Sequence, residues 1–451
     1  MIAMVTGIPL LIIIAAAIAL VVISSARFRI NPFLSLMLAA LLAGLVAGIP
    51  PLEIIPVMTK GFGDMAGAIG LIITLGTLIG VVLEESGAAQ SIAQVFLRRL
   101  GKKHVIFSMS LIGALVGIPV FADSGFLMLQ APGRRLALQT GKNPASVAIA
   151  TATGLYATHV LVPPTPGPLA AAGNLGAEQY LGMVILIGLA TSIPAILVGY
   201  WWAVRMADGN DFEDDLQDTQ QKSKPDDLPV FWKSILPILL PLMLIILGTF
   251  LRMYGQQNSG MELMLFFTHP VTALASGLLS GIIFLSENKK SPMSKWMEKA
   301  IIQAGPILLI TAAGGAFGAV LKSLPINEFF NQALGGQNLK GVWFLPIVFC
   351  ISALIKTSQG SSTAALIIVS SLLSPMLAVL KIDGAVPLAL LVSAIGSGAM
   401  VVSHTNDSYF WVVSKFGGMN LQQTLRGLTA ATLLMGLSVL AMTILLWLAF
   451  V

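Results

Sequence analysis

The stretch Thr158-His-Val-Leu-Val-Pro-Pro-Thr-Pro-Gly-Pro168 decides the fold, because it interrupts an apolar run that could otherwise cross a bilayer. It holds four prolines between positions 163 and 168. Each proline removes a backbone donor and clashes with the preceding turn, so no α-helix continues through the stretch. Unpaired backbone groups are tolerated inside a membrane only where they face protein or a water-filled cavity. The stretch therefore predicts a broken membrane helix beside a cavity.

The composition of the whole chain also indicates a membrane protein. Of the 451 residues, 56% are apolar and 10% are charged, and the mean hydropathy is +0.89. A soluble domain carries roughly a quarter charged residues. Continuous apolar runs of about twenty residues favour helices over a transmembrane barrel. We therefore expect an all-α polytopic membrane protein. Its single cysteine, Cys350, cannot form an internal disulfide.

Ten spans follow from the apolar runs, and two further apolar stretches, 105–130 and 342–375, are broken in the middle and predict re-entrant hairpins. Short amphipathic segments, Pro51 to Met65 and Ser291 to Lys299, are expected to lie in the membrane interface. The fourth and ninth spans are expected to continue past a break. The predicted spans are 3–24, 33–49, 68–84, 145–158, 181–202, 234–251, 264–285, 301–320, 386–402 and 428–450.

The distribution of basic residues predicts the orientation. Most Lys and Arg residues fall in alternate loops, among them Arg27, Arg134 and Lys415, which places those loops in the cytoplasm and the N-terminus in the periplasm. The acidic segment 206–232 is then a solvated cytoplasmic linker between two halves. The net charge of +5 is explained by cytoplasmic loops, so no nucleic acid partner is expected.

The two sides of the linker resemble each other. Gly80-Val-Val-Leu-Glu-Glu-Ser86 parallels Gly318-Ala-Val-Leu-Lys-Ser323, and an interrupted stretch follows each. The connector 98–104 carries four bases and its counterpart 331–340 carries one, as expected if an odd number of crossings per half inverts the second copy. Inverted repeats with paired broken segments are typical of secondary transporters. The interruptions are Phe121-Ala-Asp-Ser-Gly125 and Lys356-Thr-Ser-Gln-Gly-Ser-Ser-Thr363, and Ala157-Thr158-His159 parallels Val402-Ser403-His404.

This repeat predicts two five-span halves that each contribute to a scaffold and to a transport part. The predicted parts are 1–66 (scaffold), 67–178 (transport), 179–205 (last span of the first half), 206–232 (linker), 233–300 (scaffold), 301–425 (transport) and 426–451 (last span).

Small hydroxyl residues at the hairpin tips let backbone approach a ligand and add donors. If short helices begin at these tips, their N-termini favour an anion. The second break competes with helical hydrogen bonding through polar side chains instead of prolines. The hydroxyl residues are Ser124, Ser358, Ser361, Ser362 and Thr363.

Charged and titratable residues inside a membrane are costly and usually functional. Lys356 suits a carboxylate substrate as a point charge, or pairs with an intramembrane acid. Asp123 could take up a proton in each cycle if burial favours its neutral form, or could cap a helix or bind a cation. His159 and His404 could shuttle protons or pack with hydrogen bonds. Asp407 could bond neighbouring backbone or coordinate a coupling ion.

The chain lacks the sequence motifs of several other classes of protein. There is no P-loop, zinc signature or nucleophile elbow, so an ATP-driven pump has no support, and neither a cofactor nor a metal is expected. An intramembrane enzyme with Asp123 and Asp407 as a carboxylate pair is a remote alternative, and a passive channel is another.

Four motifs together resemble the gluconate permease (gluconate:proton symporter, GntP) family of the ion transporter superfamily. The resemblance extends in segment order over nearly the whole chain. It implies proton-coupled transport of sugar acids, or of D-serine in some members, by a homodimer with a scaffold and an elevator-type mobile domain. The motifs are Phe121-Ala-Asp-Ser-Gly-Phe126, the proline-rich stretch 158–168, Gln359-Gly-Ser-Ser-Thr363 and Ser403-His-Thr-Asn-Asp407.

The resemblance also implies a set of site residues. Carried over by position, the lining residues are Asp123, His159, Thr165, Lys356, Gln359, Ser361, Ser362, His404, Asn406 and Asp407. The predicted substrate-binding set also includes Ser124, Gly125, Thr158, Gly360 and Ser403, and proton coupling is assigned to Asp123, His159 and Asp407. We therefore expect a bacterial inner-membrane symporter of protons with gluconate or a related hydroxylated carboxylate. The alternative is sodium-coupled transport of a carboxylate or of D-serine.

Overall fold

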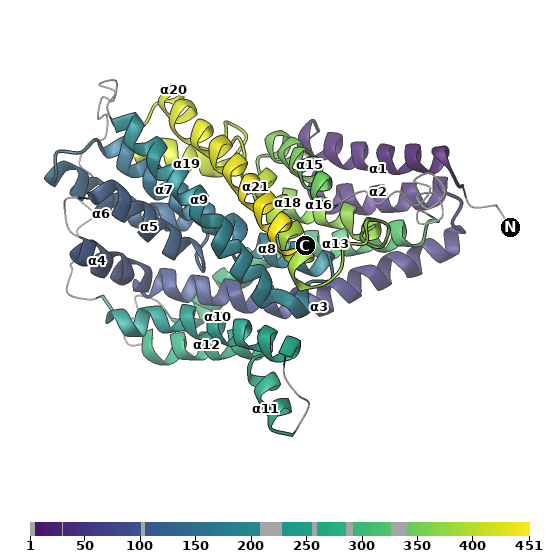
Figure 1. The fold of residues 1–451 in the computed structure, drawn as a ribbon, viewed down its shortest axis with the longest axis horizontal. Helices are drawn as coiled ribbons and strands as arrows, with labels where there is room; N and C mark the ends of the chain where they lie inside the picture. Colours follow the sequence, from purple (N-terminus) through teal and green to yellow (C-terminus); the bar gives the residue numbers. More distant parts are fainter. Residues whose placement is uncertain are drawn as a thin grey trace.

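The computed structural model describes residues 5–28, 30–100, 104–207, 228–254, 259–285, 292–325 and 341–451. These residues form helices and connecting turns, with no β-strand among them (Figure 1). Six helices of this described part are long and apolar enough to cross a membrane, or seven if one bent pair is counted as a span. The all-α prediction is therefore confirmed.

The first part of the chain forms α1 (Ile8–Ala26), α2 (Pro32–Val46), α3 (Pro51–Glu85), α4 (Ala88–Leu100), α5 (Val105–Gly117), α6 (Ala122–Gln139), α7 (Pro144–Leu161), α8 (Pro166–Asn174) and α9 (Leu181–Ala207). The second part forms α10 (Phe231–Tyr254), α11 (Ser259–Phe267), α12 (Pro270–Leu285), α13 (Met293–Lys322), α15 (Phe344–Gln359), α16 (Ser362–Leu373), α17 (Leu377–Leu380), α18 (Ala385–Met400), α19 (Ser408–Gly417), α20 (Leu421–Thr424), a π-helical turn (Leu425–Thr429) and α21 (Ala430–Phe450).

Helices α3 and α13 form the central pair, and Figure 1 shows α3 running from the end that holds α1 and α2 to the end that holds α4. They cross closely at Gly61, where an added Cβ would collide with Ala319 and lie 2.6 Å from the carbonyl oxygen of Gly315. At the other end of the pair, the Lys299 ammonium contacts Glu84 at 2.9 Å and Glu85 at 2.5 Å. The pair is therefore antiparallel and fixed at both ends.

The expected interfacial segments before these two spans are wrong as separate elements. Residues 51–65 continue into the span as one helix of 35 residues, and residues 293–299 open a helix of 30 residues. The sequence between Met65 and Ala68 contains no residue that breaks a helix more strongly than glycine. Close packing of α3 on α13 then makes small residues favourable there.

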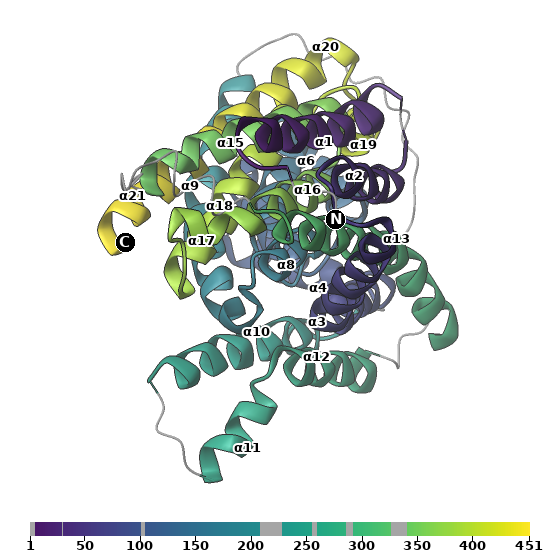
Figure 2. The ribbon, with the colours of Figure 1, turned by 90° about the vertical axis from the view of Figure 1, so that its right-hand side faces the viewer.

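The predicted span 264–285 contains a bend of 59° between α11 and α12, which the sequence analysis did not predict. Helix α11 ends at Phe267 and α12 begins at Pro270, whose fixed φ suits the first turn of a new helix. Figure 2 shows α11 projecting away from the other helices.

Two helical hairpins and two broken helices lie against the central pair. The first hairpin is α5 and α6, and the second is α15 and α16; both breaks fall within the predicted stretches 105–130 and 342–375. The first broken helix is α7 and α8, interrupted at 162–165, where the Pro163–Pro164 bond is cis. The second is α18 and α19, interrupted at 401–407. The predicted interruptions are confirmed.

Some predictions fall outside the described residues. These are the greater part of the acidic linker 206–232, the bases at 102 and 103 in the connector 98–104, and the whole connector 331–340.

Candidate functional site

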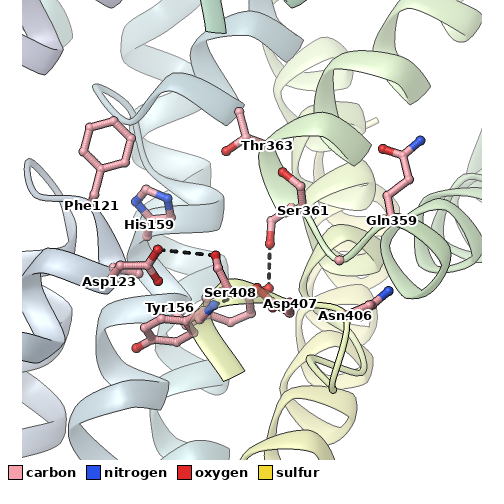
Figure 3. A pocket seen from close by; sticks show the side chains of 14 residues that line it. Phe121, Asp123, Tyr156, His159, Gln359, Ser361, Thr363, Asn406, Asp407 and Ser408 are labelled. Carbon is pink, nitrogen blue, oxygen red and sulfur yellow. Dashed lines mark hydrogen bonds between the residues drawn. The ribbon is translucent and has the colours of Figure 1, made fainter. Parts of the chain in front are cut away.

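A cavity of about 340 Å³ lies where the hairpin tips meet the second break. Figure 3 shows Phe121, Asp123 and His159 of the first part of the chain on one side, and Ser361, Gln359 and Asn406 of the second part on the other. The cavity is lined by Phe121, Ala122, Asp123, Tyr156, His159, Gln359, Gly360, Ser361, Ser362, Thr363, Asn406, Asp407, Ser408 and Tyr409.

Three helices begin at this cavity, because local sequence ends one helical segment and caps the next. Gly360 adopts φ +83° at the end of α15, and the Ser361 side chain then accepts a hydrogen bond from the Ala364 amide at 3.2 Å. Asp407 caps α19 in the same way, accepting from the Tyr409 amide at 3.0 Å. Helix α6 begins at Ala122. The partial positive charge of three helix N-termini therefore points at one cavity.

The second tip and the second break are in direct contact. A Cβ at Gly360 would collide with the carbonyl oxygen of Asn406, so only glycine permits this approach. The Asn406 side-chain amide donates to the Thr357 carbonyl at 2.6 Å, and His404 Nε2 lies 3.0 Å from the same oxygen. His404 thus supports the tip and does not line the cavity.

Lys356 is 1% exposed and does not line the cavity. Its Nζ donates to Asp407 Oδ2 at 2.6 Å and to the Gly360 carbonyl oxygen at 2.5 Å. Ser403 Oγ donates to the same carboxylate oxygen at 2.6 Å. The ammonium is therefore neutralised by an intramembrane acid, which is the alternative that the sequence left open. The ion pair joins the second hairpin to the second broken helix.

Asp123 lies in the first turn of α6 and faces the cavity. Its described polar contact is with Ser408 Oγ, which donates to Oδ2 at 3.4 Å (Figure 3). His159 packs its ring on Phe121 with centroids 5.8 Å apart, and its Nδ1 has no hydrogen-bond partner among the described residues. The cavity wall therefore holds one carboxylate in an ion pair and another, Asp123, that is outside any ion pair of the described residues.

Gln359 offers unused hydrogen-bonding capacity beside the second tip. Both its amide nitrogen and its amide oxygen are buried without a partner among the described residues. A buried amide without partners loses the hydration it would have in water. The Gln359 amide therefore keeps a donor and an acceptor without a partner in the described part of the chain.

Two tyrosines form part of the cavity and were missed by the sequence interpretation. The rings of Tyr156 and Tyr409 stack with centroids 5.3 Å apart. The Tyr156 hydroxyl shares a 2.5 Å hydrogen bond with Ser362, and the Tyr409 hydroxyl donates to the Ala152 carbonyl at 2.8 Å. The spacing of three residues between Tyr156 and His159 places them on one helix face, and that spacing could have identified Tyr156.

Several predicted site residues lie outside the cavity lining and support the breaks instead. Thr158 donates to the Ala114 carbonyl at 2.7 Å, and Thr165 donates to the Val162 carbonyl at 2.6 Å. At Gly125, an added Cβ would lie 2.6 Å from Leu155. The predicted residues that do not line the cavity are Ser124, Gly125, Thr158, Thr165, Lys356, Ser403 and His404.

Comparison with known proteins identifies relatives over almost the whole chain. Residues 8–450 match the family described as GntP family permease. The chain is 30% identical to the gluconate permease of Pseudomonas aeruginosa, covering 90% of each protein, and 29% identical to the D-serine transporter DsdX of Escherichia coli, covering 95% of this chain and 96% of the relative.

A solved structure shares the fold. The YdaH transporter of Alcanivorax borkumensis superposes with a TM-score of 0.67 at 16% identity, covering 92% of this chain and 97% of that one. The relatives are permeases and transporters, which removes the intramembrane enzyme from consideration. The chain belongs to the GntP permease family and is a multi-pass transporter of the inner membrane.

Proposed function

We propose that the protein is a secondary active transporter that moves gluconate or a related small hydroxylated carboxylate together with protons. The observation that carries this proposal is the convergence of three helix N-termini, at Ala122, Ser362 and Ser408, on one cavity that also contains an acid outside any described ion pair. Helix N-termini bind anions through their free amides and their dipole.

The substrate carboxylate would be held by backbone amides at these N-termini. The Lys356 ammonium is occupied by Asp407, so this pair adds no net charge to the cavity wall. The substrate hydroxyls would bond the Gln359 amide and the Ser361 and Asn406 side chains, which lie along the second tip and break. A sugar acid offers this combination of one carboxylate and several hydroxyls.

Proton coupling would follow from the charge of the loaded cavity. An anionic substrate beside an ionised Asp123 carries two like charges into a low-dielectric environment, which is costly. A proton on Asp123 leaves a single negative charge, which the helix N-termini stabilise. The substrate and the proton therefore favour each other's binding, and the domain crosses the membrane when both are bound. His159, on the same side of the cavity, would pass the proton to or from Asp123.

Alternating access would use an elevator motion of the transport parts, 67–178 and 301–425, against the scaffold parts, 1–66 and 233–300. The proposal is supported by the paired hairpins and broken helices, which correspond in order across the two halves and meet at the cavity. Inverted repeats with broken helices at the site are typical of such transporters. We further propose a homodimer with scaffold contacts, an N-terminus in the periplasm and a cytoplasmic linker.

The test is uptake of labelled gluconate into proteoliposomes that contain the purified protein, in sodium-free buffer, with an inward proton gradient imposed or collapsed. We expect accumulation above equilibrium only with the gradient. Equilibration without accumulation would indicate a channel and contradict coupling. Uptake that requires sodium at fixed pH would replace proton coupling with the alternative. Competition with unlabelled sugar acids and with D-serine then identifies the substrate class.

A further inference from the structure

Helices α3 and α13 each carry a pair of glycines on the side that faces the hairpins and broken helices. Gly76 and Gly80 lie on α3, and Gly314 and Gly318 lie on α13, with the same spacing and in the stretches that resemble each other in sequence. Because α3 and α13 are antiparallel, the first pair lies toward the Lys299 end of the central pair and the second toward the Gly61 end. Such small residues let neighbouring backbones approach closely.

The two pairs contact different surfaces. A Cβ at Gly80 would collide with the carbonyl oxygen of Pro119 at the first hairpin tip, and one at Gly76 would lie 2.9 Å from that of Pro164 in the first break. The pair on α13 contacts the far arm of the second hairpin instead. A Cβ at Gly314 would collide with Ser371 Oγ, and one at Gly318 would lie 3.6 Å from the Ser371 carbonyl oxygen.

Two hydrogen bonds join equivalent positions of the hairpin arms and the short helices, with the donor on the short helix in one and on the arm in the other. The Asn174 side chain donates to Ser370 at 2.8 Å, and the Gln130 side chain donates to the Phe416 carbonyl. Ser370 and Gln130 are each the ninth residue of their hairpin arm, and Asn174 and Phe416 are each the ninth residue of the short helix after a break. The residue of α6 that corresponds to Ser371 is therefore Ala131.

Corresponding surfaces differ in burial. On α16, Ile367 is 0% exposed and Ser371 is 1% exposed, whereas their counterparts on α6, Leu127 at 44% and Ala131, are exposed. For the tips and breaks the difference is reversed, because those of the first half are the more buried. Pro119 and Pro164 are buried against α3, whereas of the corresponding residues at the second tip and break Gln359 is partly exposed and Asn406 is exposed. The α13 pair thus covers the arm of the second hairpin, and the α3 pair covers the first tip and break. The surface that corresponds to each of these in the other half is left more exposed.

We infer that α3 and α13, each a continuous helix across a boundary proposed above, stay with the scaffold over their whole length. The two glycine pairs are then alternative docking positions for the hairpins and broken helices, and the contacts on the two pairs exchange during transport. In the second end state, the α6 face at Leu127 and Ala131 packs on Gly76 and Gly80, and the second tip and break pack on Gly314 and Gly318. The inference rests on the elevator motion proposed above, and it names the positioning residues of that motion. It favours small residues at both pairs, because each pair lies against a neighbouring element in both states.

Disulfide trapping tests the exchange in a Cys350→Ala background. The pair G314C/S371C reports the state of the present structure. An ideal Cβ at position 314 lies 3.5 Å from Ser371 Cβ, close to the mean of about 3.8 Å in disulfides. The corresponding pair G76C/A131C reports the second state. The mismatched pair G314C/A131C is the control and should join in neither. Cross-linking and gluconate uptake are measured in proteoliposomes before and after oxidation, and again after reduction.

We expect both matched pairs to cross-link, each to reduce uptake at least tenfold when oxidised, and each to recover on reduction. Continued uptake with G314C/S371C fully cross-linked would overturn the inference, as would active reduced protein in which G76C/A131C never cross-links. If both pairs cross-link but the reduced protein does not take up gluconate, the docking exchange stands and the proposed substrate fails.

A variant that leaves the glycines intact provides a second test. Leu127→Trp enlarges a side chain that is exposed in this state but would meet α3 in the other, so we expect uptake to fall at least tenfold while G314C/S371C still cross-links. Leu445→Trp, at a residue 62% exposed on α21, is the matched control and should retain uptake. Equal uptake by the two variants would contradict the exchange.

Discussion

The two broken helices are interrupted at corresponding positions, but by different types of residue. The first break, at 162–165, is made by prolines, is buried throughout and carries no charge. The second, at 401–407, is made by polar residues and depends on the buried ion pair of Lys356 and Asp407. Proline removes the helix by local geometry alone. Polar residues need partners from elsewhere in the fold, so the second break is sensitive to its surroundings, and its Asn406 and Asp407 line the cavity.

The largest expected effect comes from breaking the ion pair. Lys356→Met leaves the Asp407 carboxylate buried without a cation, which costs about 3–5 kcal/mol. We expect a clear loss of thermal stability in detergent and loss of uptake. The double variant Lys356→Met with Asp407→Asn should recover part of the stability, because no unpaired charge remains. If the single variant unfolds at the wild-type temperature, the second break does not depend on the pair.

Next in size is Asp123→Asn, which separates coupling from folding. Its described polar contact is the 3.4 Å hydrogen bond from Ser408, so we expect little change in stability. Proton-driven accumulation of gluconate should fall at least tenfold, since the neutral amide cannot exchange a proton. Ser408→Ala, which removes the same hydrogen bond but keeps the acid, is the control and should retain accumulation. Full gradient-driven accumulation by Asp123→Asn would remove Asp123 from the coupling mechanism.

A smaller effect is expected from the contact that joins the first half to the second tip. Tyr156→Phe removes the hydroxyl that shares a hydrogen bond with Ser362, worth about 1 kcal/mol. We expect KM for gluconate to rise several-fold with little change in fold stability. In a double-mutant cycle with Ser362→Ala, the two changes should be non-additive. Additive effects would mean that the two residues act independently on the substrate.

The smallest effect is expected at the proline break. Pro166→Ala leaves three prolines between positions 163 and 168, so the helix stays interrupted. The substitution increases the freedom of the unfolded chain and should lower the free energy of unfolding by about 0.4–1 kcal/mol. Thermal unfolding and uptake measure it. A loss as large as that of Lys356→Met would mean that the two breaks are equally sensitive to their surroundings.

The sequence predicted both hairpins, both broken helices and most of the polar residues of the cavity. It failed where a helix boundary depended on packing, as at Met65, where contact with α13 favours a continuous α3. It also failed at Tyr156 and Tyr409. Tyrosines in apolar helices resemble ordinary core residues, and only their stacking across two helices, with centroids 5.3 Å apart, makes them part of the site.

The sequence by itself determined that this protein lies in a membrane, and where its helices break. Composition acts over a whole span, and proline, glycine and capping residues act within one helical turn, so neither needs knowledge of distant partners. Only the tertiary structure decided that Lys356 binds Asp407, 51 residues away, and that Tyr156 meets Ser362, 206 residues away. Such contacts arise from how helices pack, and no local pattern encodes the distance between residues so far apart in the chain.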